Sequence, residues 1–120
     1  MAKKILIIDD EPDILTVTTF RLEKNGYKVF SALNGKEALD LLKKETPDLI
    51  LLDLVLPRIS GHELCKRIKM QEKLKDIPII LFTASSSRVR EKVRSLGASG
   101  FLLKPFSPEE LLNKIKEFLG

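Results

Sequence analysis

The sequence has only one cysteine, few aromatic residues and no long hydrophobic run. The lone Cys65 excludes an internal disulfide and agrees with a reducing compartment. No stretch approaches the roughly 20 apolar residues that a membrane-spanning helix needs. The apolar run behind Lys3 and Lys4 is short and ends in two aspartates, so it does not resemble a secretory signal. We therefore expect a cytoplasmic protein that does not bind membranes.

Positive charge is in small excess, with 21 Lys and Arg against 17 Asp and Glu and a net charge of +4. The aromatic residues are six Phe and one Tyr, and most occupy core-like positions instead of alternating with basic residues. We predict no direct binding of nucleic acid. Arg88, Arg90, Lys92 and Arg94 alternate along one expected helix, so we expect them to spread around it as a solvated face.

The length of 120 residues suits one domain, and no linker, repeat or low-complexity segment divides it. We therefore expect residues 1–120 to form a single domain without an output domain. Hydrophobic residues make up 43% of the chain and charged residues 32%, which is typical of a globular fold.

Aliphatic and β-branched runs alternate with amphipathic stretches five times. Pro12 suits a first helical position, and Asn34, Ser60 and Ser107 suit helix N-caps. The pattern predicts an α/β fold with a doubly wound, five-stranded parallel sheet. If the strand order is 2-1-3-4-5, it reverses between the first and third strands, and the mixed second strand lies at an edge. The strands are expected near residues 4–9, 28–32, 48–53, 77–83 and 100–104.

Polar residues stand where the apolar strands end: Asp9 and Asp10, Asp53, Thr83 and Lys104. A parallel sheet brings all of these ends to one edge. Carboxylates crowded there repel by about 4 kcal/mol per pair at 4 Å near a protein surface. The pattern therefore predicts a divalent-metal site beside a reactive carboxylate.

Four motifs at these strand ends carry a family resemblance. They are Ile8-Asp9-Asp10-Glu11, Leu52-Asp53 followed by Pro57 and Gly61, Phe82-Thr83-Ala84, and Lys104-Pro105-Phe106. With these motifs the chain resembles the receiver domains of two-component response regulators, such as the stand-alone chemotaxis and sporulation regulators, and this resemblance implies a flavodoxin-like (β/α)5 fold.

The expected chemistry centres on Asp53 as a nucleophile that forms an acyl phosphate. Mg²⁺, for which Mn²⁺ can substitute, would neutralise the charge of the reaction. Asp10 and Asp53 are the expected direct ligands, with Asp9 acting through a water or as a second carboxylate. The resemblance adds the backbone carbonyl of Val55 as a ligand. Lys104 is expected to pair with a phosphoryl oxygen.

The resemblance also implies a switch. Thr83 would donate its hydroxyl to the phosphoryl group, and Phe101 would turn inward as Thr83 moves. The signal would then reach the face made by the fourth helix, fifth strand and fifth helix. The Lys104–Pro105 bond is a candidate cis peptide.

The resemblance implies a signalling receiver that catalyses only its own phosphorylation and slow dephosphorylation. Its partners would be a histidine kinase or phosphotransfer protein and an unknown downstream target, with the chain a monomer or a phosphorylation-dependent dimer.

Three alternatives fit less well. An aspartyl-phosphate phosphatase or mutase would need an aspartate at Val55, and a nucleotide or flavin carrier would need a glycine-rich loop after the first strand. An inactive adaptor would not need the intact acidic set.

Overall fold

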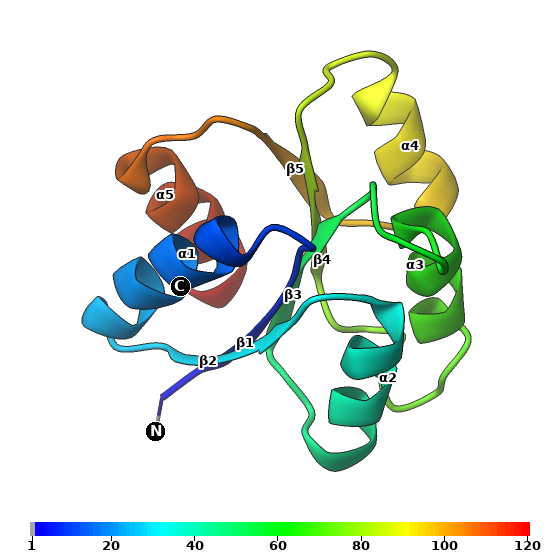
Figure 1. Ribbon diagram of the computed structural model, residues 1–120, viewed down its shortest axis with the longest axis horizontal. Helices are drawn as coiled ribbons and strands as arrows, with labels where there is room; N and C mark the ends of the chain where they lie inside the picture. The colour runs from blue at the N-terminus through cyan, green and yellow to red at the C-terminus, as the bar shows by residue number, and fades with distance from the viewer. Residues whose placement is uncertain (1) are drawn as a thin grey trace.

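Five parallel strands form one sheet with helices on both faces (Figure 1). A computed structural model describes residues 2–120 of the chain. The elements are β1 (Lys4–Ile8), α1 (Pro12–Lys24), β2 (Lys28–Ala32), α2 (Gly35–Lys44), β3 (Leu49–Asp53), α3 (Gly61–Lys69), β4 (Ile79–Thr83), α4 (Val89–Leu96), β5 (Gly100–Leu103) and α5 (Pro108–Leu119).

The strand order is β2-β1-β3-β4-β5, which confirms the predicted topology and the edge position of the second strand. The expected strand limits are wrong by one or two residues at some ends. Asp9 lies beyond β1, although its N–H still donates to the carbonyl of Ala32 at 3.1 Å. The fourth strand, β4, begins at Ile79 and not at the expected residue 77, because Pro78 has no N–H to donate to a neighbouring strand.

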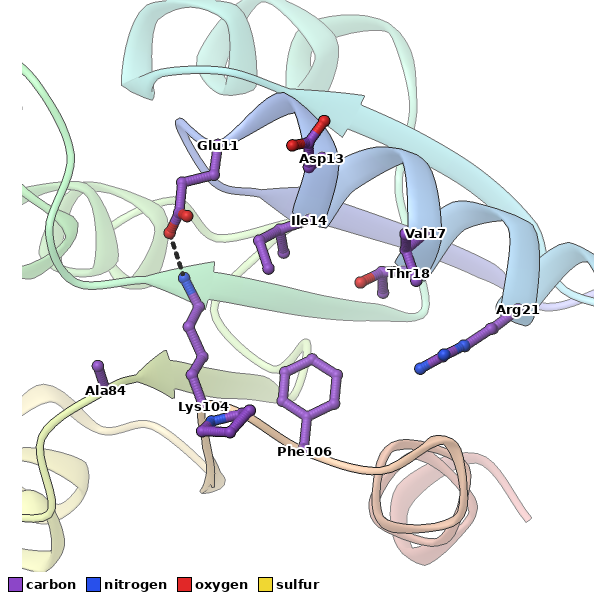
Figure 2. A pocket seen from close by; sticks show the side chains of 10 residues that line it. Glu11, Asp13, Ile14, Val17, Thr18, Arg21, Ala84, Lys104 and Phe106 are labelled. Carbon is purple, nitrogen blue, oxygen red and sulfur yellow. Dashed lines mark hydrogen bonds and ion pairs between the residues drawn. The ribbon is translucent and has the colours of Figure 1, made fainter.

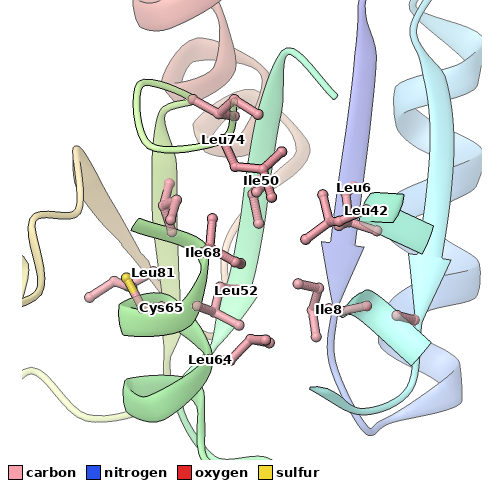
Figure 3. Packing of buried hydrophobic residues seen from close by; sticks show 14 of the residues in the cluster. Leu6, Ile8, Leu42, Ile50, Leu52, Leu64, Cys65, Ile68, Leu74 and Leu81 are labelled. Atoms are coloured by element: carbon pink, nitrogen blue, oxygen red, sulfur yellow. The ribbon is translucent and has the colours of Figure 1, made fainter. Parts of the chain in front are cut away.

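Two hydrophobic cores cover the two faces of the sheet because neighbouring residues of a strand point to opposite sides. Leu6 and Ile8 of β1 belong to the core under α2, α3 and α4, part of which Figure 3 shows. Ile5 and Ile7 belong to the core under α1 and α5. The central strands β3 and β4 are buried along their whole length, which explains their unbroken apolar sequences.

Three helices, α2, α3 and α5, begin at the side chains that were predicted to cap them. Ser107 and Glu110 form a reciprocal capping box at α5. The side chain of Asn34 accepts the N–H of Glu37 at 2.9 Å, while Glu37 reaches back to the N–H of Leu33. Ser60 caps α3 through the N–H of Glu63. Each cap satisfies backbone donors that the first helical turn leaves free.

Gly61 allows α3 to start directly against the end of β3. Its N–H donates to the carbonyl of Leu54 at 3.0 Å, and a Cβ on Gly61 would collide with the backbone of Asp53 and Leu54. Within residues 2–120, no helix is both long and apolar enough to cross a membrane.

Candidate functional site

Asp9 lies just past β1 and is fully buried, with 0% exposure. Its Oδ1 accepts the N–H of Glu11 at 2.9 Å, and its Oδ2 accepts from the Lys104 ammonium at 2.7 Å. Charged groups are rarely buried unless they are paired, and here both carboxylate oxygens have donors. The turn that leads into α1 therefore holds this carboxylate in one orientation.

Asp53 is the last residue of β3 and is 5% exposed. Its Oδ1 accepts the N–H of Val55 at 2.9 Å, and its Oδ2 accepts from Lys104 Nζ at 3.1 Å. Burial raises the pKa of the Asp53 carboxyl, against the opposing effects of the Val55 N–H and the Lys104 charge. A more basic carboxylate is a better nucleophile at a given degree of ionisation.

The side chain of Lys104, which follows β5, donates hydrogen bonds to both Asp9 and Asp53. This side chain is only 13% exposed, and its Nζ also lies 3.4 Å from Glu11 Oε1. Burial alone would lower the pKa of this ammonium, but the hydrogen bond to Asp9 and the charges of Asp53 and Asp9 outweigh it and raise the pKa. One cation thus serves three carboxylates, so its charge compensates each only in part.

Four carboxylates form a cluster at this edge: Asp9, Asp10, Glu11 and Asp53 each offer an oxygen, and these four oxygens lie within 4.8 Å of one another. Hard divalent cations take carboxylate oxygens, and Mg²⁺ sites commonly use one or two of them with waters. Asp9 and Asp53 are buried while Asp10 and Glu11 are exposed, so an ion can enter from solvent. The donor set therefore fits Mg²⁺.

Glu11 is the residue for which sequence reasoning predicted no role, although it belongs to the Asp9-Asp10-Glu11 run. It stands at the N-cap of α1, where its side chain makes no capping bond. The carboxylate is free to reach Lys104 and the cluster instead. An acidic residue at an N-cap that is followed by a proline is the signal that could have identified it.

Thr83 ends β4 and is 7% exposed, so the sheet places it at the same edge. Its Oγ1 donates to the carbonyl of Ser85 at 3.2 Å and accepts the N–H of Ser85 at 3.1 Å. The hydroxyl is thus engaged by its own loop. Lys104 N donates to the carbonyl of Thr83 at 2.8 Å, which ties the ends of β4 and β5 together.

The remaining predicted residues lie at different depths. Val55 is 77% exposed, and its N–H is the group that orients Asp53. Phe101 pairs with Leu81 in the register of β4 and β5, so it lies two residues short of the edge that carries Thr83. It is half-buried, with the guanidinium of Arg90 5.6 Å from its ring centre. The Lys104–Pro105 peptide bond is cis.

A cavity of about 540 Å³ opens beside the carboxylates, between α1 and the segment that follows β5 (Figure 2). Glu11 and Lys104 form its inner end, where Figure 2 shows their side chains pointing at each other. Ile14, Val17 and Phe106 supply apolar surface. The site is thus open on the side of α1.

These features define a class of protein: a doubly wound α/β domain with an acidic cluster and a buried Asp–Lys pair where the strand order reverses. Ligands of such sheets bind at that reversal. The family model described as the response regulator receiver domain matches residues 5–116. The chain belongs to the response regulator receiver domain family.

Individual relatives agree with this assignment. The chain is 42% identical over 121 residues to the alkaline phosphatase synthesis transcriptional regulatory protein PhoP of Bacillus subtilis, covering 99% of this chain and 49% of that protein. The chain therefore spans about half the length of this relative.

Two solved structures show the same fold. Chemotaxis protein CheY4 of Vibrio cholerae is 34% identical with a TM-score of 0.93, over 98% of this chain and 99% of that one. The receiver domain of sensor histidine kinase PA1611 from Pseudomonas aeruginosa, solved with a magnesium ion coordinated in the active site cleft, is 30% identical with a TM-score of 0.91, over 100% of this chain and 99% of that one.

Proposed function

We propose that this receiver domain is a phosphorylation-dependent switch that accepts a phosphoryl group on Asp53. The observation that supports this most is the position of Lys104 Nζ, 2.7 Å from Asp9 and 3.1 Å from Asp53, beside carboxylates that fit a divalent cation. A buried carboxylate with a cation beside it is suited to attack an anionic phosphoryl group, because charge is the main barrier to such an attack.

The phosphoryl donor is a phosphohistidine of a histidine kinase or phosphotransfer protein. The Asp53 carboxylate attacks phosphorus, a P–O bond forms and the P–N bond breaks. The electron pair of the broken bond stays on the imidazole nitrogen. The Val55 N–H on Oδ1 prevents the carboxylate from rotating during this step.

Asp10 and Asp53 would hold Mg²⁺ directly, with the carbonyl of Val55 as a further ligand and Asp9 acting through a water or as a second carboxylate. When bound there, Mg²⁺ supplies the positive charge that lets two anions approach, and Mn²⁺ can replace it. Glu11 adds a fourth carboxylate near the same position. The PA1611 receiver domain with magnesium in its cleft supports this choice of ion.

After transfer, Lys104 pairs with a phosphoryl oxygen, because its ammonium already lies beside Asp53. Thr83 exchanges its bond with Ser85 for one to another phosphoryl oxygen. Phe101 turns inward into the space that Thr83 leaves, and the face made by α4, β5 and α5 changes. This is a population shift between two arrangements, since phosphate stabilises only one of them. The signal then passes to a partner protein or to an output domain.

The cavity beside α1 supports a protein as phosphoryl donor. It leads from solvent to Lys104 and combines apolar residues with two charged ones, Asp13 in the first turn of α1 and Arg21 in its last turn. An amphipathic helix that carries a phosphohistidine could lay its apolar face along Ile14, Val17 and Phe106. The phosphoryl group would then lie near the carboxylate cluster.

Incubation with acetyl phosphate and Mg²⁺, followed by peptide mapping, tests this function. We expect one phosphoryl group on Asp53. No labelling is expected when EDTA replaces Mg²⁺ during the incubation or when the protein is Asp53→Asn. Asp76→Asn, which changes an exposed aspartate elsewhere, is the matched control and should be labelled as the unchanged chain is. Equal labelling of the Asp53→Asn protein at another residue would refute the assignment.

A further inference from the structure

The ammonium group of Lys104 has three N–H donors, and three carboxylates lie around it. Its Nζ lies 2.7 Å from Asp9 Oδ2, 3.1 Å from Asp53 Oδ2 and 3.4 Å from Glu11 Oε1. An ammonium has no further donor to offer. A phosphoryl oxygen that pairs with Lys104 must therefore take a donor that a carboxylate now holds.

The three carboxylates differ in how readily they can leave Lys104. The Asp9 side chain is 0% exposed, so its charge would be buried and unpaired without the cation. The Asp53 side chain is 7% exposed, and as the acceptor it carries the incoming phosphoryl group itself. The Glu11 side chain is 61% exposed and makes the longest of the three contacts. Water can solvate Glu11 after its release, so Glu11 is the partner that leaves at the least cost.

The backbone of Glu11 holds its carboxylate at this place. The Glu11 N–H donates to Asp9 Oδ1 at 2.9 Å, and Pro12 follows at the first position of α1. The Glu11 side chain makes no capping bond to its own helix. Among residues 2–120, the ion-pair partner of Glu11 is Lys104. The carboxylate therefore has two positions, one against Lys104 and one in water.

Glu11 also lies at the side from which the site is open. Glu11 and Lys104 form the inner end of the cavity of about 540 Å³ beside α1, and Figure 2 shows their side chains meeting there. An anion that comes to Lys104 from this side lies near the Glu11 carboxylate, and like charges repel. Glu11 thus opposes both the approach of an anion and its pairing with Lys104.

We propose that Glu11 competes with the phosphoryl group for Lys104. In the unphosphorylated chain Glu11 holds one donor of the ammonium, and a phosphoryl oxygen displaces Glu11 into water. Glu11 is thus a positioning residue that lowers the affinity of the site for anionic phosphoryl groups. This inference rests on the proposed function, in which Asp53 is the acceptor.

Two other roles for Glu11 predict different outcomes. If Glu11 were needed to hold Mg²⁺, as its place in the carboxylate cluster allows, its loss would weaken the binding of both metal and anion. If Glu11 only stabilised the N-terminus of α1, its loss would lower the stability and leave the anion affinity unchanged. Only competition makes anion binding tighter when the carboxylate is lost, provided that Mg²⁺ is saturating.

The test uses beryllofluoride, BeF3−, which binds a carboxylate oxygen as a phosphoryl group does. Titration of the whole chain at saturating Mg²⁺, followed by the ¹⁹F NMR signal of bound fluoride, measures the affinity. Glu11→Gln keeps the size of the side chain and removes its charge. We expect this variant to bind beryllofluoride about two- to fivefold more tightly than the unchanged chain, because an exposed ion pair contributes an energy of that order.

Glu109→Gln is the matched control. Glu109 is exposed in the first turn of α5, and within the described residues it is not among the carboxylates that contact Lys104. This variant should bind beryllofluoride as the unchanged chain does. The gain of Glu11→Gln should shrink as salt is raised, because salt screens exposed charges more than buried ones. Circular dichroism verifies that both variants are folded, and calorimetry verifies that Mg²⁺ is saturating for each.

Two results would overturn the competition and leave the proposed function standing. They are binding by Glu11→Gln that is equal to or weaker than that of the unchanged chain, and an equal gain in Glu109→Gln. In both cases the unchanged chain still binds beryllofluoride and Asp53→Asn does not. An unchanged chain that binds no beryllofluoride would refute the proposed function and this inference together.

Discussion

Lys104 and Asp9 are 95 positions apart in the chain, and their side chains form the shortest ion pair of the site, at 2.7 Å. Asp9 is fully buried and Lys104 nearly so. The pair forms because β1 and β5 both deliver their carboxyl ends to one edge of a parallel sheet, although they are not neighbouring strands. It holds the ammonium 3.1 Å from Asp53.

Replacing Lys104 by methionine should destabilise the fold in the absence of metal by about 3 kcal/mol, because it leaves Asp9 and Asp53 buried without their cation. Burial favours the neutral amine, yet Asp9 and Asp53 raise the pKa of Lys104 overall. The stabilisation is therefore present at neutral pH and is lost only as pH rises through the folded pKa. Urea unfolding in EDTA measures the change.

Lys36→Met is the control for this variant, since Lys36 is exposed and pairs with Asp40 at 3.2 Å on the surface of α2. Its effect should stay below about 1 kcal/mol. Mg²⁺ should restore more stability to Lys104→Met than to the unchanged chain. Equal responses of the two proteins to Mg²⁺ would contradict the placement of the ion at this cluster.

Asp10→Asn should weaken Mg²⁺ binding and, without metal, raise the melting temperature. Asp10 belongs to the carboxylate cluster but is exposed, so removing its charge relieves repulsion at little desolvation cost. Calorimetric Mg²⁺ titration and thermal melts in EDTA measure the two effects. Asp76→Asn should change neither, and an Asp10→Asn protein with unaltered metal affinity and melting would refute this role.

Gly61→Ala should cost about 1–3 kcal/mol, because its Cβ would overlap the backbone of Asp53 and Leu54. Relieving that overlap displaces Asp53, so the rate of phosphorylation by acetyl phosphate should fall as well. Gly100→Ala is the matched control: a Cβ there would meet Ile80 at 3.6 Å, an ordinary contact. A Gly61→Ala protein as stable as the Gly100→Ala protein would show that the close approach is dispensable.

Cys65 should react with a thiol reagent roughly a hundredfold or more slowly in the folded chain than in denaturant. Its side chain is fully buried, and its Sγ donates to the carbonyl of Leu96 at 3.5 Å. Burial raises the pKa of the thiol, against a small opposing effect of Lys69, so the reactive thiolate is scarce. Absorbance at neutral pH follows the reaction, and a fast native rate would mean that α3 and α4 open readily.

The alternation of strands and helices was readable because the apolar runs have different periods in the two elements. Leu49 to Leu52 and Ile79 to Phe82 are continuous apolar runs, and such runs require helices on both faces of a sheet. The caps at Asn34, Ser60 and Ser107 are local interactions within four residues, so they too could be predicted. The strand limits were less certain because pairing depends on the neighbouring strand.

The site could be predicted only in part, for the same reason. Residue order alone places Asp9, Asp53, Thr83 and Lys104 at strand ends, and strand order then brings them to one edge. Which oxygen faces Lys104 and where the hydroxyl of Thr83 points depend on side chains that are remote in sequence. The sequence could mark Glu11 as acidic, but its contact with Lys104 joins residues 93 positions apart and needed the structure.

The sequence by itself determined the fold class, the strand ends and the acidic character of the site, because local propensity and hydrophobic period operate over a few residues. Only the tertiary structure decided how one lysine is shared among Asp9, Glu11 and Asp53, and that oxygens of these three residues and of Asp10 lie within 4.8 Å of one another. These groupings join segments far apart in the chain, and their energies depend on distances and burial that exist only after the sheet and helices have packed.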